Sequence, residues 1–408
     1  MFPTFKHQTA LNPVYSIIQD SRSFVSHFLL YLIIKMQEMD FNTTSAVHYH
    51  YDQFPPQNIN YGGLITEIIN ATDALARFDQ MLKNLHNNEI LLAPLRNQEA
   101  VLSSRIEGTI STMDEILQYE ADDDGDNSQV RSDVIETILY QRALKNAQSA
   151  LEDGYSLSTG FIKQMHQQLL YLGRGAAKAP GEFKTEQNYL ADKIKKKIQF
   201  IPISPEKLDE GLEKLFHYLS ESNDPALIKT ALMHVEFEAL HPFQDGNGRI
   251  GRMLITLLLW KEGILSQPHF YISGFLEENK DLYIDTMRQV SEKGNWEDWI
   301  RFFLTAVESQ AIRNLEIAEN IKTLYEQMKN EFTELLSSKW SLTTLDFVFT
   351  NPVFRNNKFT STSGIPSATA AIITKKLFET GYLVQKQEPS GRRPALYSFE
   401  PLMRIVRV

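Results

Sequence analysis

Apolar residues recur at spacings of three and four along most of this chain, which is the pattern of amphipathic helices that bury one face. Six stretches predict helices on this pattern: residues 64–85, 90–118, 132–151, 158–173, 225–240 and 248–260. Ser158 and Thr159, at the start of the fourth stretch, are typical of a helix N-terminus. We therefore expect a mostly α-helical protein.

The helical pattern breaks between Gly173 and Pro205, where prolines and glycines interrupt it. Two short runs in this region, residues 185–191 and 197–203, flank a lysine-rich turn and predict a β-hairpin on the helical scaffold. Hairpins of this sort often act as flaps over a site. A plain surface connection is the alternative interpretation.

The last part of the chain, residues 340–408, has a pattern of its own. A helix is predicted over Ser367 to Lys376, and two short strands follow it, joined by a basic turn with Arg392 and Arg393. This order resembles a winged helix, so we expect a small α/β module whose deletion leaves the rest soluble. A role in DNA binding would place the helix in a groove and the two arginines on phosphates. Protein contacts or dimerisation are the alternative roles.

Composition limits the classes of function. The chain has 408 residues, of which 42% are hydrophobic and 23% charged, and it has no cysteine. A chain of this length can bury cores in two or three domains, and without cysteine it has no disulfide or thiol chemistry, which suits the cytoplasm. The net charge of −10 argues against whole-chain wrapping of nucleic acid, although residues 340–408 carry nine Lys and Arg against four Asp and Glu.

The first residues stand outside the periodic pattern. The apolar run at 24–34 is shorter than the roughly 20 residues of a membrane-spanning helix, so no membrane anchor is expected. Because Met36 and Met39 follow this run, we interpret part of residues 1–38 as translation from an upstream start codon. The acidic run at 121–129 is interpreted as a solvated loop. The predicted organisation is an extension (1–56), a helical region (57–125), a core (126–320), a connecting helix (321–339) and the C-terminal module (340–408).

One stretch, HPFQDGNGRIGR at 241–252, combines a histidine, an aspartate, three glycines and two arginines directly after an apolar helix. Gly246 and Gly248 allow positive φ and close backbone approach, as in an anion-binding nest. The helix that follows directs its free N–H groups and its positive end to the same point. Arg249 and Arg252 are spaced to clamp further phosphates. The stretch therefore predicts a phosphate site.

Two more side chains of this stretch suit phosphate chemistry. Asp245 offers the hard oxygen ligand that Mg²⁺ prefers, and His241 is a titratable base near neutral pH. The chain has neither a P-loop nor a zincin motif. A zinc site of His234 and His241 is an alternative, but no third ligand stands at a familiar spacing, and His234 is interpreted as a core histidine.

The stretch resembles the signature of the Fic family, H-x-F-x-[DE]-G-N-G-R-x-x-R, at every specified position. Fic enzymes move AMP from ATP onto protein hydroxyl groups. The resemblance covers about residues 57–310: SSRIEG at 103–108 is similar to the inhibitory motif [ST]-x-x-x-E-[GN], KAPGEFKTEQNYL to the target-docking flap, and ENKDLYIDTM to a segment of the nucleotide pocket. It implies a Fic-type helical core with a β-hairpin flap, in addition to the winged-helix-like module.

The resemblance also implies roles for single residues. His241 would be the catalytic base and Asp245 the Mg²⁺ ligand. Ser103, Glu107 and Gly108 would form the inhibitory motif, with Glu107 on a helix and paired to Arg252. The residues that would contact ATP are Glu107, Gln187, Asn188, Tyr189, Leu190, Gly246, Asn247, Gly248, Arg249, Arg252 and Tyr283.

The chain departs from the family's pattern at two positions. Lys184 stands where many relatives have arginine, and Ile284 stands where a second tyrosine is common. Both departures bear on the preference for adenine and for the target rather than on the reaction.

Two functions of different classes follow. The first is a protein adenylyltransferase that moves AMP from ATP to a Tyr, Ser or Thr hydroxyl of a target docked at the flap and of itself. It would be autoinhibited by Glu107, with removal of AMP as a second reaction. The second is a DNA-binding regulator whose Fic-like core senses nucleotide. A homodimer and a phosphate or phosphocholine donor stay open.

Overall fold

The computed structural model describes residues 46–83, 88–122, 131–192, 196–391 and 393–408. These residues form two compact units, one with residues 46–47, 189–192 and 196–201, the other with the remaining described residues. The apolar run at 24–34, the upstream start and most of the acidic loop lie outside the described residues. None of the described helices combines the length and apolar character that a bilayer crossing requires.

The smaller unit is built around a β-hairpin. Strand β2 (Leu190–Asp192) pairs antiparallel with β3 (Lys197–Ile201), and β1 (Val47–His48) extends the sheet in the order β1-β3-β2. Ile198 and Phe200 are buried between less buried neighbours, which is the alternation of a strand with one covered face. The predicted hairpin is confirmed, although its first strand begins at Leu190 and not at residue 185.

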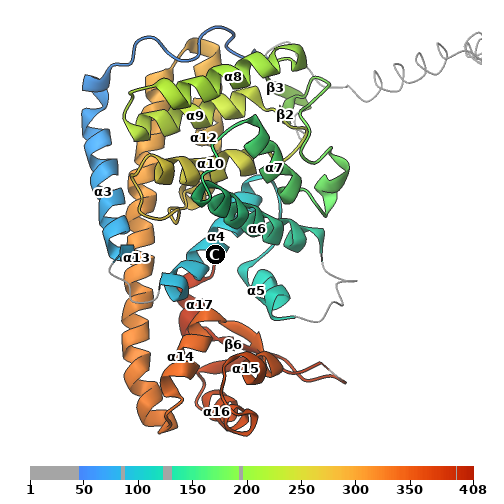
Figure 1. Ribbon diagram of the computed structural model, residues 1–408, viewed down its shortest axis with the longest axis vertical. Coiled ribbons are helices and arrows are strands. Elements are labelled where there is room, and N and C mark those ends of the chain that lie inside the picture. Colours follow the sequence, from blue (N-terminus) through green and yellow to red (C-terminus); the bar gives the residue numbers. More distant parts are fainter. Residues whose placement is uncertain (1–45, 84–87, 123–130, 193–195, 392) are drawn as a thin grey trace, which may run out of the picture. The chain divides into compact units, whose positions relative to one another are not determined.

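The larger unit is mostly helical (Figure 1), as the spacing of apolar residues predicts. Its helices before the C-terminal module are α3 (Ile65–Lys83), α4 (Asn88–Ile106), α5 (Met113–Ala121), α6 (Ser132–Glu152), α7 (Thr159–Leu169), α8 (Pro205–Glu221), α9 (Ala226–Leu240), α10 (Asn247–Lys261), α11 (Ser273–Glu278), α12 (Lys280–Lys293) and α13 (Trp296–Leu336). Two 3₁₀ helices, η1 (Tyr61–Leu64) and η2 (Arg174–Ala177), accompany them.

The predicted helical stretch at 90–118 is two helices, because the chain turns between α4 and α5. Gly108 has φ of +87°, a left-handed conformation that ends the α-helix. Thr112 then caps α5 through reciprocal hydrogen bonds with Glu115. Glu107 consequently lies in the turn that follows α4. The expectation that Glu107 lies on a helix is wrong.

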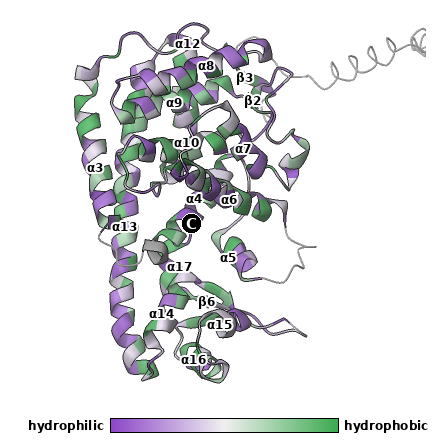
Figure 2. Cartoon of the chain, viewed as in Figure 1, coloured by the Kyte–Doolittle hydropathy of each residue, from purple (hydrophilic) through white to green (hydrophobic). Residues whose placement is uncertain are grey.

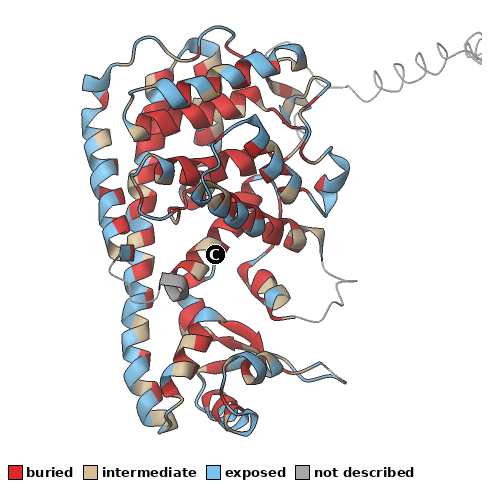
Figure 3. Cartoon of the chain, in the orientation of Figure 1, coloured by how far each residue is buried: buried red, intermediate tan, exposed pale blue. Residues whose placement is uncertain are grey.

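The helices α9 and α10 lie side by side in the interior of the larger unit. Figure 3 shows both buried along most of their length, and Figure 2 shows that α10 is mainly hydrophobic. Helix α9 buries residues on every side, which is typical of a central helix rather than of a surface helix with one apolar face. The turn that joins these two buried helices contains residues 241–246, so the fold holds this turn from two sides.

The C-terminal module follows the long helix α13, which packs along α3 (Figure 1). Its elements are α14 (Ser341–Thr350), β4 (Val353–Arg355), α15 (Asn356–Thr362), α16 (Ser367–Glu379), β5 (Leu383–Gln387), β6 (Leu396–Phe399) and α17 (Glu400–Val406). The strands form an antiparallel sheet in the order β4-β6-β5. The predicted helix and the two strands after it are present as α16, β5 and β6.

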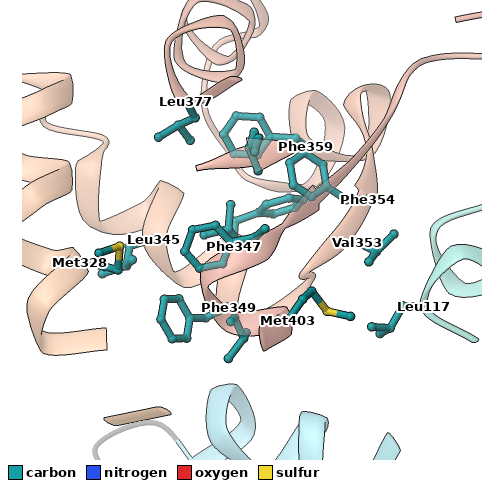
Figure 4. Packing of buried hydrophobic residues seen from close by; sticks show 14 of the residues in the cluster. Leu117, Met328, Leu345, Phe347, Phe349, Val353, Phe354, Phe359, Leu377 and Met403 are labelled. Atoms are coloured by element: carbon teal, nitrogen blue, oxygen red, sulfur yellow. The ribbon is translucent and has the colours of Figure 1, made fainter. Parts of the chain in front are cut away.

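The apolar core of the module includes side chains from helices outside residues 340–408. Leu117 of α5 and Met328 of α13 belong to the same cluster of buried side chains as Phe349, Val353 and Met403 (Figure 4). Deletion of residues 340–408 would therefore expose apolar faces of α5 and α13. This packing does not fit the expectation that the rest stays soluble without the module. The local pattern of neither segment shows a shared core, so the sequence alone could not indicate it.

Candidate active site

The turn between α9 and α10 has an unusual backbone. His241 ends α9 with φ of 45° and ψ of 61°, and Gly246 precedes α10 with φ of 78°. Glycine adopts this left-handed conformation freely, but a histidine does so only where the surrounding structure fixes it, at a cost of about 1–3 kcal/mol. Strained residues of this kind cluster at functional sites.

The imidazole ring of His241 is suited to accept a proton. Its Nδ1 lies 3.3 Å from the carbonyl oxygen of Glu238, so a hydrogen on Nδ1 donates there and leaves the lone pair of Nε2 available. Burial, followed by the positive charge of Lys184, lowers the pKa of His241 to about 4. The ring is therefore neutral at pH 7, the form that a general base needs.

The start of α10 presents backbone donors. The first hydrogen bond within this helix runs from the N–H of Ile250 to the carbonyl of Gly246 at 3.1 Å, so the N–H groups before Ile250 belong to the open end of the helix. The side chain of Asn247 donates to the carbonyl of Phe243 and accepts from its N–H, both at 2.8 Å. Asn247 therefore shapes the turn with its side chain and leaves anion contact to the backbone.

Arg249 is a buried cation with spare donors. Its Nη2 lies 3.4 Å from Oδ1 of Asp245, and its Nη1 lies 3.5 Å from Oε2 of Glu136. Nε and Nη1 of Arg249 nevertheless have no hydrogen-bond partner among the described residues. Buried guanidinium groups normally use all their hydrogen-bond donors. The unused donors of Arg249 are therefore suited to bind an anion.

Asp245 lies at the edge of this site. Its Oδ1 accepts from the N–H of Gly246 at 2.6 Å, and its side chain is 43% exposed. A carboxylate that is partly exposed and close to a phosphate-binding helix start is suited to hold Mg²⁺ together with phosphate oxygens.

Arg252 is paired with the predicted inhibitory motif. Its Nη2 donates to Oε1 of Glu107 at 2.7 Å and to the carbonyl of Ser103 at 2.9 Å, and its Nε donates to Oγ of Ser103 at 2.9 Å. Burial acts to raise the pKa of Glu107, but the guanidinium of Arg252 outweighs it and holds this pKa below its ordinary value. Glu107 is consequently ionised at pH 7 and occupies the donors of Arg252.

Gly248 explains how the carboxylate fits so close to α10. A Cβ atom at this position would collide with Oε1 of Glu107 and would lie 2.9 Å from Nη1 of Arg252. Only glycine leaves room here, so the carboxylate of Glu107 lies against the first turn of the helix whose N–H groups and arginines suit phosphate. The structure therefore brings Ser103, Glu107, His241, Asp245 and the arginines together, as predicted.

The other predicted contacts of ATP have different surroundings. Gln187 donates to the carbonyls of Asn188 and Pro202, and Asn188 donates to those of His241 and Phe243, so both side chains hold backbone groups. Tyr283 of α12 is buried, and its hydroxyl lies 2.7 Å from Nε2 of His234. The interpretation of His234 as a core histidine agrees with its burial.

Two predicted contacts lie in the smaller unit. Tyr189 is 43% exposed, and Leu190 is the first residue of β2. Their part in ATP binding stays a prediction.

Sequence reasoning missed one titratable group of the site. Burial raises the pKa of Glu238 to about 8, and its Oε1 has no hydrogen-bond partner among the described residues. A Cβ atom at Gly251 would lie 2.5 Å from this oxygen, which places the carboxyl group against α10. The sequence offers no signal that separates Glu238 from Lys229 and Glu236, the other charged residues of the same helix.

Family models of known proteins match this chain over the same region. The model of the Fic/DOC family N-terminal region matches residues 65–149, and the model of the Fic/DOC family matches residues 156–259. The first contains the Ser103–Gly108 motif, and the second contains His241 and both arginines.

Relatives with assigned names share modest identity. A protein adenylyltransferase of Caenorhabditis briggsae is 28% identical over 133 residues, which are 31% of this chain and 24% of the relative. A probable protein adenylyltransferase of Aquifex aeolicus is 25% identical over 207 residues, which are 50% of this chain and 58% of the relative. The chain thus spans less than two thirds of each of these relatives.

Solved structures share the fold. A Fic family protein from Desulfovibrio desulfuricans is 17% identical with a TM-score of 0.53, and the match covers 85% of this chain and 98% of the other. A Fic domain containing signaling protein from Bacteroides thetaiotaomicron is 20% identical with a TM-score of 0.50, and the match covers 62% and 96% of the two chains.

Proposed function

This chain belongs to the Fic family, and from that premise we propose that it is a protein adenylyltransferase. It moves AMP from ATP to a Tyr, Ser or Thr hydroxyl of a target protein and of itself, and Glu107 inhibits it. The named relatives support the reaction, since their names assign it to them.

One observation carries the inhibitory part of the proposal. The carboxylate of Glu107 uses the donors of Arg252 and lies against Gly248 at the start of α10. An internal anion thus lies where the helix end and the arginines favour a phosphate. We propose that ATP binds with its α-phosphorus correctly aligned only when this carboxylate has moved away.

The proposed reaction forms one bond to phosphorus and breaks another, and groups of this site take the proton and hold the phosphates. The oxygen of the target hydroxyl attacks the α-phosphorus of ATP, the bond from this phosphorus to the bridging oxygen breaks, and pyrophosphate leaves. Nε2 of His241 takes the proton of the hydroxyl. The N–H groups at the start of α10, Arg249 and Arg252 stabilise the negative charge of the phosphates by their fixed positions.

Asp245 is the residue that would hold Mg²⁺. Its carboxylate is partly exposed and lies beside Arg249, so the donor set fits a hard cation shared with phosphate oxygens. Bound Mg²⁺ would neutralise charge on the phosphates.

Incubation with ATP labelled at the α-phosphate tests the proposal. We expect weak self-labelling of the wild-type chain, strong labelling of Glu107→Gly and none of the double variant with His241→Ala. ATP labelled at the γ-phosphate is the control, because AMP transfer leaves no such label on protein. Label from the γ-phosphate alone, or none from either donor in Glu107→Gly, would contradict the proposal.

Removal of AMP, docking of the target at the hairpin, a homodimer and DNA binding through residues 340–408 stay predictions of the sequence.

A further inference from the structure

The strained turn at His241 is held through its carbonyl groups. The carbonyl of Leu240 accepts from Nζ of Lys184 at 2.9 Å, and that of Pro242 accepts from the backbone N–H of Lys184 at 2.8 Å. The carbonyls of His241 and Phe243 both accept from Nδ2 of Asn188, each at 3.0 Å. Two residues of one loop thus supply donors to four consecutive carbonyls around the base.

Lys184 also orders Asn188. Its Nζ donates to Oδ1 of Asn188 at 2.9 Å, which fixes the orientation of the amide so that Nδ2 points to the carbonyls of His241 and Phe243. Removal of the amine would therefore free the carbonyl of Leu240 and loosen the two bonds that Asn188 makes. The left-handed conformation of His241 depends on these contacts, because it is costly for a residue with a Cβ atom.

The amine group of Lys184 is buried, and no carboxylate of the described residues pairs with it. The residue is 3% exposed, and both acceptors of its Nζ are uncharged. Burying an unpaired ammonium group is unfavourable, and burial lowers the pKa of Lys184 to about 7. Near pH 7 the group therefore exchanges between amine and ammonium, and its charged form acts on the imidazole of His241.

We propose that Lys184 is a positioning residue for His241, which holds the base in its left-handed turn and places a positive charge beside it. This inference deepens the proposed function and rests on it. The charge disfavours protonation of the imidazole, so it sets the pH at which the ring changes from its charged to its neutral form. Two other charged groups act on the same ring, Asp245 from the turn and Glu107 from the turn after α4, and the ring also bonds the backbone carbonyl of Glu238 in α9.

Three variants separate geometry from charge, each made in Glu107→Gly so that transfer is measurable. Lys184→Met removes the donors and the charge, whereas Lys184→Arg keeps both. Lys163→Met is the matched control, because Lys163 of α7 is partly exposed and pairs with Glu182. We expect kcat to fall about tenfold or more in Lys184→Met, with KM for ATP within about twofold, since the phosphate contacts remain.

The pH dependence of kcat distinguishes the two roles, because a purely structural effect would leave it unchanged. Loss of the charge in Lys184→Met should raise the pKa of His241, so the acid limb of kcat moves to higher pH. Lys184→Arg and Lys163→Met should keep the limb where the parent has it. Titration of the His241 ring by NMR should show the same order of pKa values without any need for activity.

The outcomes are distinct. Equal kcat and an unmoved pKa of His241 in folded Lys184→Met would overturn the inference while leaving the proposed function intact. Absence of transfer from the parent Glu107→Gly would count against the proposed function, and the NMR titration would then decide on Lys184 alone. If Lys184→Met fails to fold, Lys184→Gln, whose amide keeps N–H donors without the charge, takes its place in both measurements.

Discussion

The arginines at the start of α10 and those of the C-terminal module differ in their partners. In the module, Arg355 and Arg393 both pair with Asp122 at 2.5 Å, and Arg407 pairs with Asp114 at 2.7 Å. At α10, two nitrogens of Arg249 lack a hydrogen-bond partner among the described residues. Three arginines of the module bind the rest of the chain, whereas Arg249 of α10 has donors without a partner in the described part of the chain.

The hydrogen-bond partners of a cation show whether it is available to a ligand. Residues 340–408 carry nine Lys and Arg against four Asp and Glu, an excess that favours phosphate contact with DNA. Three of these nine cations pair with α5, since Asp114 lies in the first turn of this helix and Asp122 is its C-cap. Donors of a cation that have no acceptor therefore indicate a ligand better than the number of charged residues does.

The largest expected effect concerns the base. His241→Ala in the Glu107→Gly background should lower single-turnover transfer by about 10²–10⁴-fold, the usual range for a general base. The affinity for ATP, measured by calorimetry, should change little because α10 keeps its donors. Transfer at the parental rate would show that another group takes the proton.

The second effect concerns stability and the module. Arg355→Ala removes a side chain that is 4% exposed and bonds Asp122, Gln387 and the carbonyl of Pro394. We expect the free energy of unfolding in urea to fall by about 2 kcal/mol. Arg393→Ala, at a side chain 56% exposed, is the control and should cost less than about 1 kcal/mol. Equal losses would mean that burial does not separate these two pairs.

The third effect tests whether the two regions differ in kind. Glu107→Gly should raise single-turnover transfer by about tenfold or more, which corresponds to about 1.4 kcal/mol of transition-state stabilisation. Asp114→Asn, which breaks an ion pair of the module, should leave transfer unchanged. Activation by both substitutions would show that the contact with the module, and not Glu107 alone, controls the site.

The smallest effect concerns the metal. Asp245→Ala should raise the Mg²⁺ concentration needed for half-maximal transfer several-fold, since phosphate oxygens still bind the cation. A Mg²⁺ titration of the Glu107→Gly chain with and without this substitution measures it. An unchanged requirement would remove Asp245 from the metal site.

The sequence predicts features that depend on neighbours along the chain. The spacing of apolar residues predicts the helices, and the glycines at 246 and 248 predict the turn before α10. The break after Glu107 was missed because the apolar spacing continues on both sides of Gly108.

Features that depend on distant contacts could not be predicted in this way. Nothing near Leu117 indicates that it packs against Met403, and nothing near Asn188 indicates that its amide faces the carbonyl of His241. The raised pKa of Glu238 likewise results from burial among helices that lie apart in the sequence.

The missing side chain at Gly248 has a consequence for the competition between Glu107 and ATP. The carboxylate is tethered to its own binding position, so it acts as a ligand at an effective concentration of about millimolar or more, whatever the concentration of the protein. On the proposed function, dilution would not relieve inhibition, and a second chain would have to weaken the tether rather than outnumber it. A Cβ atom at 248 would collide with Oε1 of Glu107 and crowd Nη1 of Arg252, so a larger residue here would disturb the tethered carboxylate together with the cation that holds it.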